Sequence, residues 1–393
     1  MKILQVHNRY SHPGGEDTVL TNEARLLREH GHQLELLEAH NDDAPPSGLP
    51  AQWRLAREML WSTAGVAAMN AALDRFAPDV VHVHNTFNKL SHAVIRTAVA
   101  RRVPVVQTLH NYRLACANGL LLREGRPCEL CLSQGRWNAL RHRCYRGSLP
   151  ASAVVSLSGA LHLRLGTFKQ RGLRVIALTN FSRQLFLRAG LTAQVLRVKP
   201  NFVYRQVAAV PQAGRGQHVV FVGRLAAEKG VDLLLDAWRR LAPPGWTLEL
   251  IGDGELRPAA ASLDASVRWL GWLPPAEVMA RIASARFLVM ASPWYEGLPM
   301  VLLEAYSAAT PIIVPRLGGM GEVLDEGRTG HGFDPGSVAS LADVLGRALA
   351  LPPSAWQALS DGALRAYQAL YSPAVNHRQL LSIYQEAIDE LSP

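Results

Sequence analysis

EGLPMVLLE, residues 296–304, places two carboxylates, Glu296 and Glu304, eight positions apart around a glycine, a proline and an apolar run. Just before it, FLVMAS (287–292) is the kind of short apolar run that forms a strand buried on both faces of a parallel sheet. The two segments together predict a strand, a loop and then a helix. Glu296 is expected in the loop, and Glu304 about one and a half turns into the helix.

The loop itself has the features of an anion site. Gly297 gives the backbone freedom, and Pro299 suits a first helical turn. The first amides of a helix have no partner within it, so they are free to bind an anion. The expected binding residues are Gly297, Leu298, Pro299, Met300, Val301 and Glu304. Two unrelated surface glutamates are the alternative interpretation.

Similar apolar runs alternate with helix-like stretches along the whole chain, a rhythm that predicts parallel sheets covered by helices on both faces. The expected strands are 3–7, 33–37, 80–84, 104–110, 174–179, 218–223, 247–252, 287–292 and 311–315. The linker-like stretch 207–217 divides them into two groups. We therefore predict an α/β protein with two Rossmann-like, doubly wound domains, at 1–205 and 206–375, and a last helix at 376–393 that packs back on the first domain.

Composition points to a globular protein. The chain has 393 residues, of which 48% are hydrophobic and 19% charged, and no run is long and apolar enough for a membrane span. The start lacks a signal-peptide pattern, so a cytoplasmic location is expected. Lys and Arg outnumber Asp and Glu by 26 to 13 in residues 1–200, but number 15 against 19 in the rest. This basic first half could attract an anionic partner.

A second candidate loop follows the strand at 218–223. Arg224 comes directly after Gly223, and Lys229 lies at the mouth of the next expected helix. Two cations beside a helix N-terminus suit a diphosphate. A solvated charge pair with Glu228 is the alternative.

The first domain offers two more such loops. Gly14 and Gly15 follow the first strand and precede a helix, which would let backbone approach a ligand, although the dinucleotide fingerprint G-x-G-x-x-G is absent. His110 and Asn111 end the fourth expected strand, and a neutral histidine can hydrogen-bond a hydroxyl or carbonyl oxygen. His82 and His84 are expected to be strand-packing residues rather than metal ligands.

HPGGE, FVGRLAAEKG, LIGDGE and the segment from Pro293 to Leu324 resemble glycosyltransferase family 4, whose fold is GT-B. The resemblance covers nearly the whole chain. It implies two domains facing across a cleft, a retaining transfer from a nucleotide-diphosphate sugar, and no metal required for catalysis. Glu296 and Glu304 match the family's E-x7-E motif. By position, Arg224 and Lys229 would hold the diphosphate, Glu304 the ribose and Glu296 the donor sugar.

The resemblance also implies that Gly15 approaches the phosphates and that His110 touches the sugar or the reaction centre. The donor would be of the UDP or GDP type. The acceptor would be a hydroxyl of a glycan, lipid-linked or of the cell envelope, with peripheral contact to the anionic inner face of the membrane. Two alternatives stay open: a nucleotide-sugar epimerase of the same fold, and a basic zinc-containing protein without catalysis.

All four cysteines lie in a segment, about 114–150, that departs from the commonest family pattern: Cys116, Cys128, Cys131 and Cys144. A C-x2-C pair with two outer cysteines can bind one structural Zn²⁺ with four thiolates. Reduced, unligated thiols are the alternative. The segment is also arginine-rich, but recognisable nucleic-acid motifs are missing, so a nucleic-acid partner is not expected.

Overall fold

The computed structural model describes residues 1–10, 14–41, 48–211, 214–257 and 265–392. The chain forms two compact units. Unit 1 comprises residues 1–123, 128–200 and 376–393, and unit 2 comprises residues 124–127 and 201–375. The division falls after Pro200, whereas the sequence suggested 205.

A six-stranded parallel sheet forms the centre of unit 1. Its spatial order is β2 (Gln33–His40), β1 (Lys2–Arg9), β3 (Val80–Val83), β4 (Val105–Leu109), β7 (Leu173–Ala177) and β8 (Leu196–Val198). The central strands β3 and β4 are buried along their whole length, as continuous Val-rich runs require in a sheet covered on both faces.

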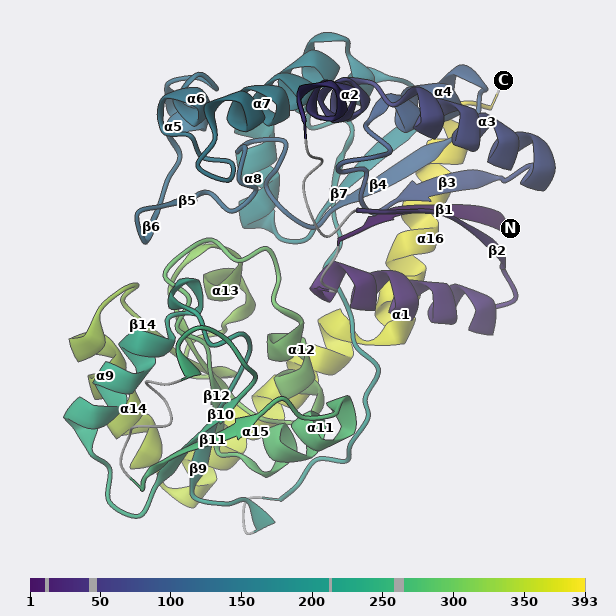
Figure 1. Ribbon diagram of the computed structural model, residues 1–393. Coiled ribbons are helices and arrows are strands. Elements are labelled where there is room, and N and C mark those ends of the chain that lie inside the picture. The colour runs from purple at the N-terminus through teal and green to yellow at the C-terminus, as the bar shows by residue number, and fades with distance from the viewer. Residues whose placement is uncertain (11–13, 42–47, 212–213, 258–264, 393) are drawn as a thin grey trace. The chain divides into compact units, whose positions relative to one another are not determined.

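The helices of unit 1 cover the two faces of this sheet (Figure 1). They are α1 (Gly15–Glu29), α2 (Leu49–Leu60), α3 (Thr63–Phe76), α4 (Ala93–Ala100), α7 (Leu149–Arg164), α8 (Asn180–Arg188) and α16 (Pro373–Asp389), with a 3-10 turn η1 (Thr167–Lys169). The last helix, α16, packs Leu380, Ile383 and Tyr384 against Ile3 and Val80 of the sheet. The C-terminal segment thereby completes the core of unit 1.

Short elements form the cysteine-containing segment. They are β5 (Leu122–Arg123), β6 (Arg126–Pro127), α5 (Leu130–Ser133) and α6 (Asn138–Arg141), and β5 pairs with β6 in a separate two-stranded sheet. Because none of these elements exceeds four residues, the segment has little regular structure with which to order itself.

A second six-stranded parallel sheet forms the centre of unit 2. Its order is β11 (Val267–Gly271), β10 (Thr247–Ile251), β9 (His218–Val222), β12 (Phe287–Val289), β13 (Ile312–Pro315) and β14 (Gly330–Phe333). The strand order reverses direction at β9 and β12, and in open parallel sheets ligands bind beyond the carboxyl ends of the strands at such a point.

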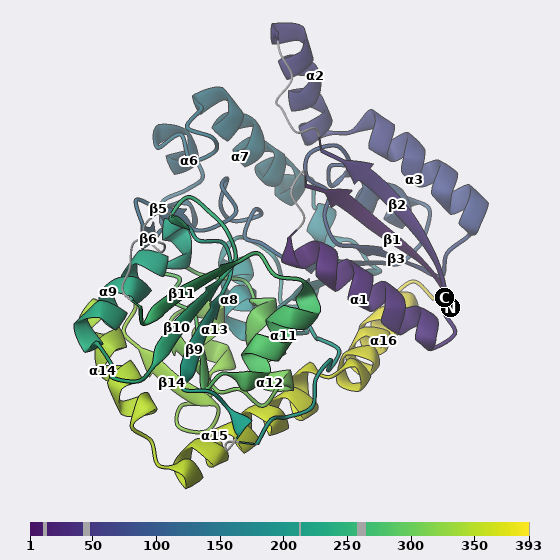
Figure 2. The same ribbon diagram turned by 60° about the horizontal axis from the view of Figure 1, so that its bottom comes forward.

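Helices flank this sheet too: α9 and α14 lie on one side, and α11 and α12 on the other (Figures 1 and 2). The helices are α9 (Val231–Leu241), preceded by a 3-10 turn η3 (Ala227–Lys229), then α11 (Pro275–Ser284), α12 (Met300–Ser307), α13 (Gly318–Val323), α14 (Val338–Leu349) and α15 (Pro353–Ala366), which runs into a π-helical turn η4 (Tyr367–Tyr371). Trp238 of α9 and Leu345 of α14 join Phe221 and Leu248 in one core.

The predicted fold class is confirmed: two parallel six-stranded sheets, each with flanking helices. Each of the nine expected strands coincides with an observed one, although the boundaries differ by up to three residues. The sequence reasoning missed three outer strands, β8, β11 and β14. Strand β14 has the sequence GHGF, and its two glycines and one histidine are not typical of a strand. It forms a strand because it is buried against β13.

Candidate active site

Lys229 and Glu296 form an ion pair at the carboxyl edge of the second sheet. The Lys229 ammonium donates to Glu296 Oε1 at 2.7 Å, and the Ser292 hydroxyl donates to the same oxygen at 2.9 Å. The ring of Trp294 lies beneath the ammonium, with its centroid 5.6 Å from Nζ. The side chains of Lys229 and Glu296 are 25% and 9% exposed, so this pair is partly withdrawn from water. The arrangement fixes the position of the Lys229 ammonium, which can bind an anion there.

Glycines explain why the chain can pack so closely here. Gly230 caps α9 in a left-handed conformation, with φ at 69°, and a Cβ at this position would lie 2.0 Å from the carbonyl oxygen of Ala291. A Cβ on Gly252 would lie equally close to the carbonyl oxygen of Gly223. Both positions require glycine, because backbone passes directly against backbone. Lys229 and Gly223 therefore owe their placement to neighbouring loops.

Arg224 behaves differently from Lys229. Its side chain is 65% exposed and forms an ion pair with Glu228. This is the pair that the sequence offered as the alternative to phosphate binding. Since exposed pairs contribute little stability, Arg224 can exchange Glu228 for a ligand at small cost.

The N-terminus of α12 has no side-chain cap. Pro299 is the N-cap residue rather than part of the first turn, and the first amide bonded within the turn is that of Leu302, to the Pro299 carbonyl. Leu298, Leu302 and Leu303 are buried and fix the helix to the core. Gly297, Met300 and Val301 are partly exposed, in keeping with a place for a ligand beside the helix.

Glu304 lies in the second turn of α12 and is partly exposed. Burial raises the pKa of its carboxyl above the ordinary value. A ligand diol would favour the ionised form, because its two hydroxyls would donate to the carboxylate.

In unit 1, His110 follows β4 and contacts a second histidine: His110 Nε2 lies 3.1 Å from His84 Nδ1. Both residues line a cavity of about 50 Å³ together with Asn111 and Arg113. Burial lowers the pKa of His110 to about 4, so the ring is neutral near pH 7. Asn111 accepts a hydrogen bond from the Arg113 amide at 3.1 Å, which orients its side chain.

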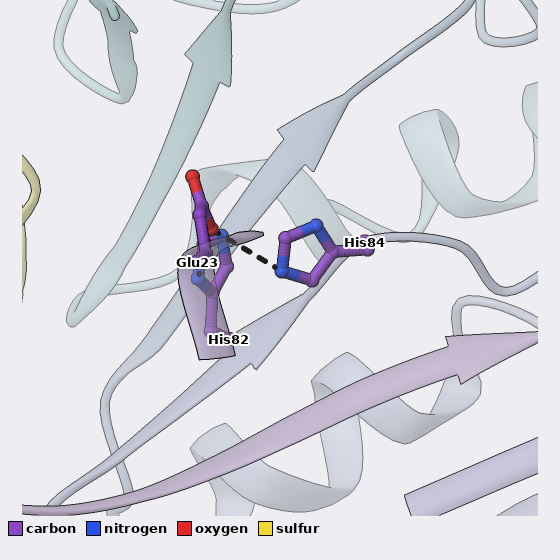
Figure 3. A group of neighbouring side chains, drawn as sticks. All are labelled: Glu23, His82 and His84. Carbon is purple, nitrogen blue, oxygen red and sulfur yellow. Dashed lines mark ion pairs between the residues drawn. The ribbon is translucent and has the colours of Figure 1, made fainter. Parts of the chain in front are cut away.

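His84 belongs to a buried group of ionisable side chains with Glu23 and His82 (Figure 3). Lys199 Nζ donates to Glu23 Oε1 at 2.8 Å, and both side chains are fully buried. His84 Nε2 lies 3.5 Å from Glu23 Oε2. Burial alone would raise the pKa of Glu23, but Lys199 and His84 hold it below its ordinary value. We assign the His84 proton to Nε2, facing this carboxylate, so that His84 Nδ1 accepts from His110 Nε2–H and leaves His110 Nδ1 as an acceptor.

The glycine loop after β1 is already engaged. The Gly14 amide donates to Asp17 Oδ2 at 2.8 Å, and Asp17 also lies 3.1 Å from both His7 and Arg9. Asp17 thus caps α1, which Gly15 begins. The neighbouring Glu16 accepts from Asn85, and burial raises its pKa to about 8. The helix N-terminus therefore carries acids of its own before any ligand arrives.

Several of these residues gave no signal in the sequence. Glu23 and Lys199 are 176 positions apart, and neither belongs to a recognisable motif. Ser292 lies in FLVMAS and Trp294 in the segment from Pro293 to Leu324, but the sequence suggested no role for either residue. Lys199 follows β8, an outer strand that the sequence reasoning missed, so neither its burial nor its acidic partner could be inferred from the sequence.

The chain shares its fold and sequence with known sugar-transferring enzymes. Residues 13–206 match the family model described as Glycosyltransferase Family 4, and residues 216–350 match Glycosyl transferases group 1. The chain is 27% identical over 316 residues to the glycogen synthase of Mycobacterium tuberculosis, which covers 77% of this chain and 68% of that protein. It is 28% identical over 216 residues to the lipopolysaccharide 1,6-galactosyltransferase of Salmonella typhimurium, with 51% and 60% covered.

The structure of HepE from Anabaena in complex with UDP-glucose superposes with a TM-score of 0.65, at 18% identity, over 98% of this chain and 100% of HepE. The fold and the paired family matches define a GT-B glycosyltransferase that uses a nucleotide-sugar donor. The chain belongs to glycosyltransferase family 4. Neither the epimerase nor the non-catalytic alternative is favoured.

Proposed function

We propose that this chain is a retaining hexosyltransferase that moves a sugar from a UDP- or GDP-type donor to a hydroxyl of a lipid-linked or cell-envelope glycan, at the cytoplasmic face of a membrane. The observation that carries the proposal is the Lys229 ammonium, held 2.7 Å from Glu296 at the carboxyl edge of the second sheet. The naming of the Salmonella relative as a lipopolysaccharide galactosyltransferase supports the class of acceptor.

In this proposal Lys229, Arg224 and the first amides of α12 stabilise the negative charge that develops on the departing diphosphate. Preorganised cations and amides do this without reorganising at the moment of reaction, so the step does not require a metal. Glu304 accepts hydrogen bonds from the ribose hydroxyls, and Glu296 contacts the donor sugar. The Gly15 region of unit 1 would approach the phosphates.

Retention needs the acceptor hydroxyl to attack the face from which the diphosphate leaves. The hydroxyl proton passes to the departing phosphate oxygen, so the C–O bond that breaks and the bond that forms share one face. His110, neutral and with Nδ1 as an acceptor, orients a sugar hydroxyl in this scheme. The carboxylates are then binding groups rather than the acid and nucleophile of a glycosidase.

A surface of unit 1 supports membrane contact. Helices α2 and α7 pack together and expose Trp53, Leu49 and Leu157, which are 74%, 72% and 52% exposed. Arg54 and Arg57 flank the groove between the two helices. Exposed aromatic and aliphatic side chains with flanking arginines suit an interfacial site on anionic lipid. Across the described residues, none of the helices has both the length and the apolar character for a membrane crossing.

The enzymatic part is tested by incubating the purified chain with UDP- and GDP-hexoses and a lipid extract of the bacterial envelope. Sugar transfer with release of nucleoside diphosphate, and an unchanged anomeric configuration by NMR, would support the proposal. Turnover of the nucleotide sugar to an isomer without an acceptor would contradict it, as would inversion of the anomeric centre.

The membrane part is tested by sedimentation with vesicles of phosphatidylcholine alone or with anionic phosphatidylglycerol. We expect binding to the anionic vesicles, and its loss in a variant that combines Trp53→Ser with Leu157→Ser. Trp272→Ser is the matched control, because Trp272 is 73% exposed but belongs to unit 2. Equal sedimentation of the wild type with both vesicles, or of the variant and wild type, would refute the contact.

A further inference from the structure

The four cysteines of the segment 114–150 are all free thiols, and they are brought into one neighbourhood by local hydrogen bonds. The hairpin β5–β6 returns the chain so that the Cys128 amide donates to the Leu121 carbonyl at 2.7 Å. The side-chain amide of Asn118 donates to the Leu122 carbonyl, and Cys116 Sγ donates to Asn118 Oδ1. Asn118 therefore links this hairpin to the first cysteine. Cys116 and Cys128 are therefore both tied to the hairpin β5–β6 by hydrogen bonds.

Of the other two cysteines, Cys131 lies in α5 and Cys144 in the turn that follows α6. Cys131 and Cys144 both pack against a small apolar cluster formed by Met59, Ala117, Ala139 and Val155. The Cys144 amide donates to the Ala139 carbonyl at 3.0 Å, and Ala139 is itself part of this cluster, so the bond holds Cys144 beside it.

The thiols also influence one another electrostatically. Burial first, and then the neighbouring Cys116, Cys144 and Cys128, raise the pKa of Cys131 to about 11. The pKa of Cys144 is raised by burial and then by Cys116 and Cys128. Cys131 and Cys144 thus lie within electrostatic range of each other and of the other two cysteines.

Arg136 supplies an independent observation. Its side chain is partly buried, its guanidinium lies within electrostatic range of Cys131 and Cys116, and its Nη2 donates to the Leu114 carbonyl. Throughout the part of the chain that the structure describes, no carboxylate pairs with Arg136. Gly159 makes room for it, since a Cβ there would lie 2.9 Å from Nη1. A buried cation without an anion is costly, and the thiols are the groups beside it that can become anionic.

We propose that Cys116, Cys128, Cys131 and Cys144 bind one Zn²⁺ as a structural site in unit 1, with Arg136 as its counter-charge. Binding converts four thiols and Zn²⁺ into a tetrathiolate complex of charge −2 and releases four protons, without any change in oxidation state. The dianion pairs with the Arg136 guanidinium, and the ion ties together a segment whose helices and strands are too short to order it. Zinc sites of this kind contribute free energy to folding locally.

A second cluster of metal-type ligands does not compete with this assignment. Among the described residues, Glu23, His82 and His84 form the group whose ligand atoms all lie within 4.8 Å of one another. Lys199 already neutralises Glu23, and both ring nitrogens of His82 have hydrogen-bond partners, Tyr384 and Thr108. No three of the four cysteine sulfurs all lie within 4.8 Å of one another, so binding of Zn²⁺ must draw the sulfurs closer together.

The first test measures metal in the full-length protein purified under reducing conditions without added metal. We expect about one Zn per chain by elemental analysis, which is the stoichiometry of a four-thiolate site. The Cys128→Ser, Cys131→Ser variant should lose the metal and unfold at lower temperature, whereas Ser133→Ala, a control on the same short helix, should retain it. Metal-free wild-type protein with reduced thiols, or with disulfides by mass spectrometry, would overturn the site.

The second test identifies the ligands and the role of Arg136. Cobalt-substituted protein should show the absorption of tetrahedral Co²⁺ bound by four sulfurs, unchanged in His142→Ala. Arg136→Met should weaken metal affinity at least tenfold while the cobalt spectrum keeps its shape, because no ligand is removed. Loss of the metal in His142→Ala would overturn the four-thiolate set, and unchanged affinity in Arg136→Met would overturn the counter-charge. None of these readouts depends on transferase activity, so they stand apart from the proposed function.

Discussion

Replacing Lys229 by methionine and Glu296 by glutamine should move nucleotide affinity in different directions. In the structure the Lys229 ammonium is 2.7 Å from the Glu296 carboxylate, so a diphosphate must compete with that carboxylate for the same cation. Lys229→Met removes the cation that the diphosphate needs. Glu296→Gln leaves the cation and removes its competitor, while it also alters the group proposed to contact the sugar.

The magnitudes follow from the kind of contact. A hydrogen bond to a charged group contributes about 1.5–3 kcal/mol, and each 1.4 kcal/mol is a factor of about ten in affinity. Lys229→Met should therefore weaken UDP or GDP binding roughly ten- to a hundredfold. Glu296→Gln should keep nucleotide affinity the same or make it a few-fold tighter, and should slow sugar transfer by about two orders of magnitude.

Isothermal calorimetry with free UDP and GDP gives the affinities, and a nucleotide-release assay gives the transfer rate. Arg239→Met is the matched control, because Arg239 is an exposed cation on α9 whose ion pair with Asp236 is solvated. It should change neither quantity. A tenfold loss of nucleotide affinity in Glu296→Gln, or none in Lys229→Met, would refute the reasoning.

Three further predictions concern buried ionisable groups of unit 1. Lys199→Met should destabilise the chain by about 3–5 kcal/mol in urea unfolding, because it leaves the Glu23 carboxylate buried without its cation, and combining it with Glu23→Gln should restore part of that loss; additive effects would argue against the pair. His110 has its pKa lowered to about 4 from 6.5, so the unfolded chain takes up the proton first and stability falls as pH drops from about 6.5 to about 4. His110→Gln should make this fall shallower by up to about 3 kcal/mol, and an unchanged slope would contradict the assignment. Glu16 has its pKa raised to about 8 from 4.5, so its protonated form favours folding below pH 4.5 and this contribution is lost as pH rises through about 8. Thermal unfolding should therefore show Glu16→Gln to be more stable than the wild type at pH 9 and equal to it at pH 4, and the same stability difference at both pH values would contradict the raised pKa.

The fold could be predicted because most of its strands have a composition that is typical of buried strands. Val80–Val83 and Ile312–Pro315 are short, apolar and β-branched, and both are fully buried in the structure. The sequence did not predict the strand Val267–Gly271, because it is an outer strand. Its side chains are only partly buried and include Arg268 and Trp269. Where burial is incomplete, composition no longer distinguishes a strand from a loop.

The candidate site could be predicted only as separate loops. Lys229 and Glu296 were each recognisable by position, between a strand and the helix that follows it. Their contact joins residues 67 positions apart, so it depends on the neighbouring order of β9 and β12 in the sheet. The pairing of Lys199 with Glu23 was out of reach for the same reason. Local sequence patterns indicate which loops follow strands. Which two loops come into contact depends on the order of the strands in the whole sheet.

Helix α16 has a consequence for how this protein is made. It covers Ile3, Val80, Val106 and Ile176 with Leu380, Ile383 and Tyr384, yet it follows the whole of residues 201–375 in the chain. A ribosome that adds 5–20 residues per second needs roughly 10–35 s to reach it after residue 200. For that interval the nascent first unit carries an open apolar face, while the second unit, continuous from residue 201, can already close its core. The unit that is translated first is thus the one that folds last, and the growing chain needs protection at that face until translation has passed residue 387.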